Sequence, residues 1–142
     1  MSLSCHLVFD GVCDRAFRAY QRILGGELKT LLTFGQSPLA EQLPPDWQGR
    51  ILHATLVLDD QELMGSDAFP GAYAQPQGFS VTVGYADVDR ARAVFDALAD
   101  GGRLHMPFQA TFWSPGFGVL VDRYGVPWEV NCTAAAQENP AG

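Results

Sequence analysis

The chain has 142 residues, of which 47% are hydrophobic, and nine Lys and Arg against sixteen Asp and Glu give it a formal net charge of −7. A chain of this length is typical of one globular domain, whose core forms without disulfide or metal crosslinks. Lys29 is the single lysine, so the composition excludes the basic patch that nucleic acid or an anionic membrane surface requires. We therefore expect neither nucleic acid nor a membrane as a partner.

Two further features concern location and redox state. No apolar run approaches the roughly 20 residues of a membrane-spanning helix, and no basic residue precedes Arg15, so no secretory signal is indicated. The three cysteines form an odd set without Cys-x-x-Cys spacing, which predicts free thiols. We expect a cytoplasmic protein.

The first half of the chain predicts one helix among four strands. Apolar residues from Ala16 to Leu24 recur at helical spacing, and Gly25-Gly26 ends that helix. The residues between 35 and 49 contain Pro and Gln and predict a loop. Strands are expected at Cys5–Phe9, Glu27–Phe34, Ile51–Leu58 and Glu62–Ser66.

The second half repeats this order when the sequence is shifted by about 75 positions. Cys13-Asp14-Arg15-Ala16 then falls on Val88-Asp89-Arg90-Ala91. Asp87 is the expected N-cap of the second helix, which Gly101-Gly102 ends. Strands are expected at Phe79–Tyr85, Gly102–Phe108, Phe117–Asp122 and Val126–Cys132.

The repeat predicts two βαβββ modules within one domain at residues 1–134. Module one spans residues 3–67, a linker spans 68–77, module two spans 78–132, and residues 133–142 form a flexible tail. One helix covers one face of each sheet, so we expect the other faces to form a cleft. Clefts of this kind bind small molecules.

Several motifs together resemble the vicinal oxygen chelate superfamily of glyoxalase, bleomycin-resistance and dihydroxybiphenyl dioxygenase folds, and within it the PhnB-like branch. The resemblance covers about residues 5–132. The motifs are Phe9-Asp10-Gly11, Tyr20 with Leu24-Gly25-Gly26, His53-Ala54, Leu63-Met64-Gly65-Ser66-Asp67, Thr111-Phe112-Trp113, Phe117-Gly118 and the segment from Asp122 to Asn131.

The resemblance implies an α+β, glyoxalase-like fold in which the two modules form a cupped eight-stranded mixed sheet, usually in a homodimer. It also implies, in metal-dependent members, four ligands from the first and last strands of each module. Those positions fall on Cys5 or, with a one-residue slip, His6; on Met64, with Glu62 and Asp67 as fallbacks; on Phe79; and on Glu129. Only Glu129 is a clear match, and a phenyl ring cannot coordinate a metal ion. We therefore expect no metal site and no cofactor.

Some members of this branch carry the name demethylubiquinone methyltransferase. An adenosyl-type methyl donor is normally held by a Gly-rich turn between a strand and a helix. Here Gly25-Gly26 and Gly101-Gly102 are predicted to end helices, so the sequence gives that activity no support.

Glu129 is the best candidate for a catalytic group. By strand alternation it shares a face with Pro127 and Asn131, and a carboxyl in a cleft is a candidate acid or base. His53 is a candidate second group. The residues expected to line the cleft are Cys5, Leu7, His53, Met64, Phe79, Phe112, Trp113 and Glu129.

Some of these residues have a structural interpretation as well. Phe112, Trp113 and Phe117 form either a lid that stacks on a flat ligand or a loop pinned to the core by its aromatics. Asp67, at a strand end, is expected to accept backbone N–H groups of a turn, and Cys5 is expected to be a packing residue more often than a nucleophile.

Three functions remain open from the sequence. The first is a metal-free protein that binds a small, partly apolar and aromatic molecule, with an acidic pocket favouring cationic or hydrogen-bonding ligands. The second is an enzyme, either a metal-dependent lyase or dioxygenase or an acid–base catalyst using Glu129. The third is a scaffold whose surface is its working part.

Overall fold

The computed structural model describes residues 1–134. The chain divides into two compact units, residues 1–75 and 76–142, which contain module one and module two respectively. Residues 135–142, which make up most of the expected tail, lie outside the described residues.

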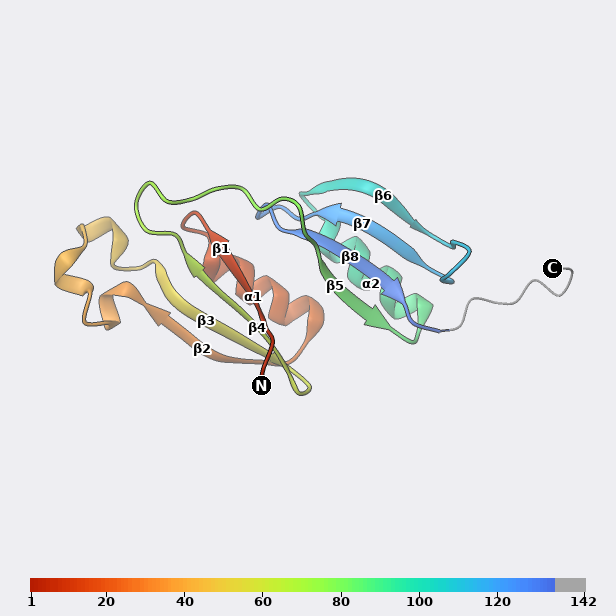
Figure 1. Cartoon of the computed structure of the whole chain (residues 1–142), viewed down its shortest axis with the longest axis horizontal. Coiled ribbons are helices and arrows are strands. Elements are labelled where there is room, and N and C mark those ends of the chain that lie inside the picture. The colour runs from red at the N-terminus through yellow and green to blue at the C-terminus, as the bar shows by residue number, and fades with distance from the viewer. Residues whose placement is uncertain (135–142) are drawn as a thin grey trace, which may run out of the picture. The chain divides into compact units, whose positions relative to one another are not determined.

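Module one is a βαβββ unit, as the sequence predicts (Figure 1). Its strands form one mixed sheet in the order β1-β4-β3-β2, in which β1 and β4 run parallel and the other pairs antiparallel. Its elements are β1 (Cys5–Phe9), α1 (Cys13–Leu24), β2 (Glu27–Thr33), β3 (Ile51–Leu58) and β4 (Gln61–Asp67).

Module two repeats this topology (Figure 1). Its sheet has the order β5-β8-β7-β6, with β5 parallel to β8 and the other pairs antiparallel. Its elements are β5 (Val81–Tyr85), α2 (Val88–Ala99), β6 (Arg103–Gln109), β7 (Phe117–Val121) and β8 (Pro127–Cys132). The two helices lie 75 positions apart, so the internal repeat predicted from the sequence is confirmed for them.

The core of module one lies between α1 and one face of its sheet. Phe17 and Tyr20 of the helix are buried, as are the strand residues that alternate toward it, Leu7 and Phe9 among them. Gly65 of β4 permits this contact, because a Cβ atom there would lie 2.4 Å from the Phe17 ring. Burial of each large apolar side chain contributes about 1.5–3 kcal/mol.

The core of module two is built in the same way. Asp87 caps α2, its carboxylate accepting a hydrogen bond of 2.9 Å from the Asp89 amide, as predicted. Phe95 of the helix packs over Gly118 of β7, where a Cβ atom would lie 2.5 Å from the ring. Trp128 and Val130 are fully buried on this side of the sheet.

Two parts of the chain differ from the sequence prediction. The segment between β2 and β3 contains three short 3₁₀ helices, residues 34–36, 40–42 and 45–47. The strand expected at Phe79–Tyr85 begins two residues later, at Val81.

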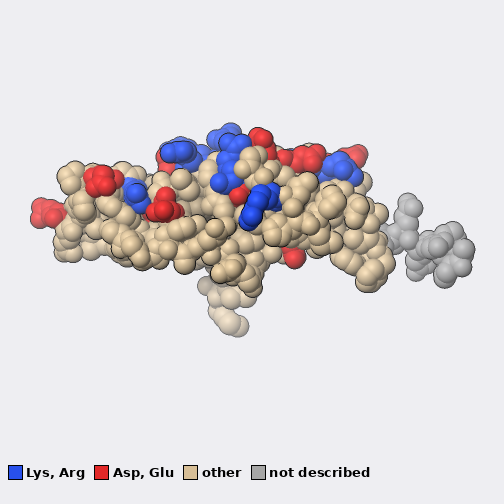
Figure 2. All heavy atoms as spheres, turned by 90° about the horizontal axis from the view of Figure 1, so that it is seen from above, with Lys and Arg blue, Asp and Glu red and all other residues tan. Residues whose placement is uncertain are grey.

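The net charge of the chain and the shortness of its apolar runs predict that neither nucleic acid nor a membrane is a partner. On the face shown in Figure 2, basic and acidic side chains are interspersed. Among residues 1–134, no helix is long and apolar enough to cross a membrane.

Candidate functional site

Each sheet has a second face, which we call its open face, formed by the side chains that alternate away from the helix. In module one, Ala54 and Leu56 of β3 are fully buried, which places His53 and Thr55 on the open face. The cross-strand pairs Thr55–Met64 and His6–Met64 bring Met64 and His6 to the same face.

A pair of histidines marks the open face of module one. The rings of His6 on β1 and His53 on β3 are stacked with centroids 6.1 Å apart, although β4 separates the two strands. The His6 Nε2 atom lies 2.9 Å from the Ser66 hydroxyl, and the His53 Nε2 atom lies 3.0 Å from the Thr55 hydroxyl. Desolvation, and then the neighbouring His53, lower the pKa of His6.

Three of the expected cleft residues of module one lie on different faces. Met64 is half-buried on the open face. Leu7 is 1% exposed and belongs to the core beneath α1, so its expected place in a cleft is wrong. Cys5 alternates with Leu7 on that covered side, and partial burial raises the pKa of its thiol, which disfavours the reactive thiolate.

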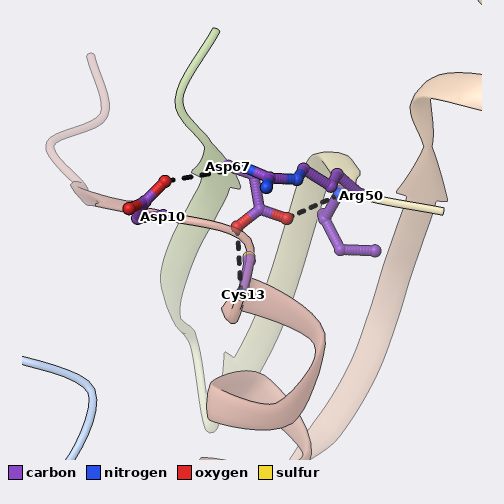
Figure 3. Close-up of polar contacts among 5 residues, drawn as sticks. Asp10, Cys13, Arg50 and Asp67 are labelled. Atoms are coloured by element: carbon purple, nitrogen blue, oxygen red, sulfur yellow. Dashed lines mark hydrogen bonds and ion pairs between the residues drawn. The ribbon is translucent and has the colours of Figure 1, made fainter. Parts of the chain in front are cut away.

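Asp67 has a structural role (Figure 3). It is 3% exposed, and its carboxylate accepts hydrogen bonds from the backbone N–H of Cys13 at 3.1 Å and of Ile51 at 2.8 Å. It thereby joins the end of β4 to the first residues of α1 and β3, and it caps a helix whose own N-cap, Val12, has no side-chain hydrogen bond.

An ion pair lies beside this carboxylate. Arg50 contacts Asp10 at 3.6 Å (Figure 3), and its guanidinium lies 4.1 Å from the centre of the Trp47 ring. Cys13 is fully buried, and desolvation together with the Asp67 and Asp14 charges raises the pKa of its thiol. These groups hold the fold together and offer no reactive thiolate.

The open face of module two carries polar groups on its two parallel strands. Trp128 and Val130 point to the core, so Glu129 and Asn131 point to the open face, as alternation predicts. Thr82 of β5 is paired with Glu129, and its hydroxyl donates a hydrogen bond of 3.3 Å to Glu129 Oε2. The buried Oδ1 atom of Asn131 accepts no hydrogen bond from the described residues.

Three aromatic side chains adjoin this polar group. Phe117 of β7 is paired with Asn131. Its ring centre lies 5.2 Å from that of Trp113, which in turn lies 4.7 Å from that of Phe112. Phe112 is 91% exposed and Trp113 is 46% exposed, so both offer open ring surface. We call Phe112, Trp113 and Phe117 the aromatic cluster.

Ser114, and not the aromatic side chains, pins this loop. Its hydroxyl is fully buried and lies 2.7 Å from the Gly116 carbonyl oxygen and 2.9 Å from that of Cys132. The Thr111 amide donates to the Ser114 carbonyl at 2.9 Å, which closes the turn. The aromatic side chains are therefore displayed from an anchored loop instead of serving as its anchor.

Phe79 does not occupy the strand position that the sequence comparison gave it. It lies before β5 and is 44% exposed, whereas the β5 residue paired with Glu129 is Thr82. The expected strand began two residues too early, and the residue opposite Glu129 is the second residue of β5, not the first. In module one the corresponding pair is His6 and Met64.

Sequence reasoning placed Asn131 on the face of Glu129 but missed its unpaired oxygen, and it also missed Thr82 and the role of His6 as a partner of His53. Alternation with Leu7 and Phe9 could have placed His6 on the open face. Thr82 and the unpaired oxygen of Asn131 have no signal in the sequence, since both depend on the register between β5 and β8. Among residues 1–134, no group of three or more His, Cys, Asp or Glu side chains is placed to hold a metal ion.

The fold and the repeated module define a protein of the glyoxalase-like fold class. A glyoxalase-related enzyme from Fulvimarina pelagi shares the fold, with a TM-score of 0.65 at 13% identity over 94% of this chain and 88% of that one. More specifically, residues 1–131 match the family described as 3-demethylubiquinone-9 3-methyltransferase. The chain belongs to this family.

Individual relatives agree with this assignment. Protein YjdN of Escherichia coli (strain K12) is 38% identical over 92% of this chain and 95% of its own length. The crystal structure of protein PA1353 from Pseudomonas aeruginosa is 41% identical with a TM-score of 0.84, covering 93% of this chain and 97% of that one. A structure from Bacillus cereus described as a putative 3-demethylubiquinone-9 3-methyltransferase, PhnB protein, is 25% identical with a TM-score of 0.79, covering 94% and 100%.

The turns of this chain do not resemble a methyl-donor site. Gly25 and Gly26 follow α1, and Gly101 and Gly102 follow α2. Between β1 and α1 there is a single glycine, Gly11, and between β5 and α2 there is none. A Gly-rich turn that opens a helix, as adenosyl cofactors usually require, is absent from both modules within the described residues.

Proposed function

We propose that the protein binds a small, partly apolar and flat molecule on the open face of module two. The observation that supports this most strongly is the placement of the aromatic cluster beside the polar group of Thr82, Glu129 and Asn131. Ligand sites combine apolar surface with a few polar groups that fix orientation, and this face has both.

The exposed rings favour ligand binding over a purely structural role. Phe112 and Trp113 are large apolar side chains left in water by a loop that Ser114 already holds in place. An aromatic pair contributes about 0.5–1.5 kcal/mol beyond the area it buries. A flat ligand stacked on Trp113 would gain both the burial and the pairing.

We further propose that binding requires no chelated metal ion. With the strand register of the structure, the four positions that the resemblance assigns to the ligands of metal-dependent members correspond to His6, Met64, Thr82 and Glu129. A neutral hydroxyl and a thioether are poor ligands for hard or borderline divalent ions. These four side chains do not fit a divalent metal ion. Glu129 instead accepts a hydrogen bond from the hydroxyl of Thr82.

A titration followed by amide chemical shifts tests the binding proposal. A panel of uncharged bicyclic aromatic fragments, with 2-naphthamide as its reference, is added to ¹⁵N-labelled protein treated with chelator. Fragments of this size bind with a Kd on the order of 1 mM. We expect shifts centred on residues 111–119 and on Thr82, Glu129 and Asn131, and weaker binding in Trp113→Ala. If no fragment changes the amide chemical shifts of these residues, the proposal is contradicted.

An enzyme is the second candidate, because Glu129 is a half-buried carboxylate on a face suited to ligands. It would be either an acid–base catalyst using Glu129, with His53 as a second group, or a metal-dependent lyase or dioxygenase. Glu129→Gln distinguishes the candidates once a ligand is known: a catalyst keeps its ligand affinity and loses turnover. Addition of Zn²⁺, Mn²⁺, Fe²⁺, Ni²⁺ or Mg²⁺ raises the melting temperature only if the protein binds the ion.

A further inference from the structure

We infer that the ligand of module two is a flat aromatic cation whose charge resides on N–H groups, such as an aryl amidinium or guanidinium. This inference rests on the proposed function and adds the chemical class of the ligand. It follows from which hydrogen-bonding groups the open face leaves unused.

Two of the polar groups beside the aromatic cluster carry an acceptor oxygen without a donor among the described residues. Glu129 offers a carboxylate of which Oε2 already accepts from Thr82, while Oε1 accepts no hydrogen bond from the described residues. Asn131 has an amide oxygen without a donor. An acceptor-rich face selects a ligand that brings donors, and a carboxylate selects one that also brings positive charge.

No cation of the protein neutralises Glu129 within the described residues. The ion pairs of residues 1–134 involve other carboxylates: Asp14, Glu62, Asp10 and Asp100. The basic residue that shares the open face of module two is Arg103, which is paired with Val121 at the far end of β7, whereas Glu129 is paired with Val119. The negative charge of Glu129 thus remains available to a ligand.

The spacing suits a ligand in which the ring and the charge are joined directly. Residues two apart on a strand lie about 7 Å from each other, so Glu129 lies about that far from Asn131, whose cross-strand partner is Phe117. A bicyclic ring on Trp113 and Phe117 can therefore extend its exocyclic group to Glu129. The ring faces of the aromatic cluster also attract positive charge.

Three ligands that differ only in their exocyclic group test the inference. They are 2-naphthamidine, a cation with N–H donors; 2-naphthamide, which is neutral; and 2-naphthoate, an anion. Calorimetry and amide shifts give their affinities for the full chain and for three variants, Glu129→Gln, Trp113→Ala and Glu62→Gln. Glu62 is an exposed carboxylate of module one and serves as the matched control.

We expect the amidine to bind about tenfold more tightly than the amide, the effect of one charge-assisted hydrogen bond, and the naphthoate to bind most weakly. Glu129→Gln should remove the preference for the amidine and leave amide binding unchanged, whereas Glu62→Gln should preserve the preference. Trp113→Ala should weaken the binding of the amidine and of the amide to the same extent.

The outcomes separate this inference from the proposed function. All three ligands could change the amide shifts of the open face of module two and bind with similar affinity, or Glu129→Gln could retain the preference for the amidine. In either case the inferred ligand class is wrong while the binding function stands. If none of the three ligands shifts this face, both are contradicted.

Discussion

The imidazole of His53 lies close enough to that of His6 to influence the protonation of His6. Desolvation and the neighbouring His53 lower the pKa of His6 from its ordinary value of 6.5. Because its folded pKa lies below its unfolded pKa, the folded state binds fewer protons between the two values. The contribution of His6 to stability is therefore complete above about pH 6.5 and declines as the pH falls below that value.

Replacement of the neighbouring ring tests this coupling. We predict that His53→Asn raises the pKa of His6, because it removes a group that becomes positively charged 6.1 Å away. The measurement is an NMR titration of the His6 ring protons between about pH 4 and pH 9, whose midpoint gives the pKa of His6. His105→Asn, on the exposed part of β6, is the control. An unchanged midpoint in His53→Asn would show that the rings do not interact.

At the scale of the elements, Asp67 links three of them, and its removal should destabilise module one. In Asp67→Asn, one of the two backbone N–H groups of Cys13 and Ile51 faces an amide NH₂ in place of an oxygen. We predict a loss of about 2–3 kcal/mol in the free energy of unfolding, the value of one hydrogen bond to a charged group. Urea unfolding measures it.

Asp10→Asn is the matched control for this carboxylate, since Asp10 makes a longer contact of 3.6 Å with Arg50 and is 66% exposed. It should change the free energy of unfolding by less than about 1 kcal/mol. Equal effects of the two substitutions would contradict the structural role given to Asp67.

The contact between helix and sheet gives a second prediction at this scale. Gly118→Ala introduces a Cβ atom 2.5 Å from the Phe95 ring, so α2 or the ring must move. We predict a loss of about 1–3 kcal/mol from overpacking. Gly49→Ala, where nothing lies within 4 Å, should leave the free energy of unfolding nearly unchanged in the same urea experiment. If Gly118→Ala leaves the free energy of unfolding unchanged, α2 packs against β7 less tightly than the 2.5 Å distance indicates.

Element types and most boundaries could be predicted from the sequence, because helical and strand periodicity are local signals. The positions of β1 and β3 and the face of Glu129 were predicted correctly. The residues of the candidate sites could not all be predicted from local periodicity. Whether Phe79 or Thr82 opposes Glu129 is decided by where β5 begins and by its register with β8, which follow from tertiary contacts that one sequence does not reveal. The face of His6, by contrast, could have been inferred from its alternation with Leu7 and Phe9.

At the scale of the whole molecule, the edge strand β6 is a candidate contact between two copies of the chain. Leu104 is 56% exposed and Met106 is 40% exposed, and both lie on a strand whose other edge is unpaired within the described residues. Exposed edges and apolar side chains favour association. An association of two copies is also what the family resemblance leads us to expect.

We predict that the protein sediments as a dimer and that the double substitution Leu104→Glu and Met106→Glu shifts it to a monomer, because it places like charges in the contact. Sedimentation equilibrium measures the mass, and circular dichroism checks that the variant is folded. A folded variant that stays dimeric would assign the contact to another surface.

We propose above all that the open face of module two holds a flat ligand without a metal ion. A crystal structure of the chelator-treated protein soaked with 2-naphthamidine tests it most directly. We predict density for the naphthyl ring against Trp113 and Phe117 with the amidinium on Glu129, and no ion beside it. Ligand density confined to another part of the molecule, or a metal ion bound by Glu129 in untreated crystals and required for the ligand to bind, would contradict the account.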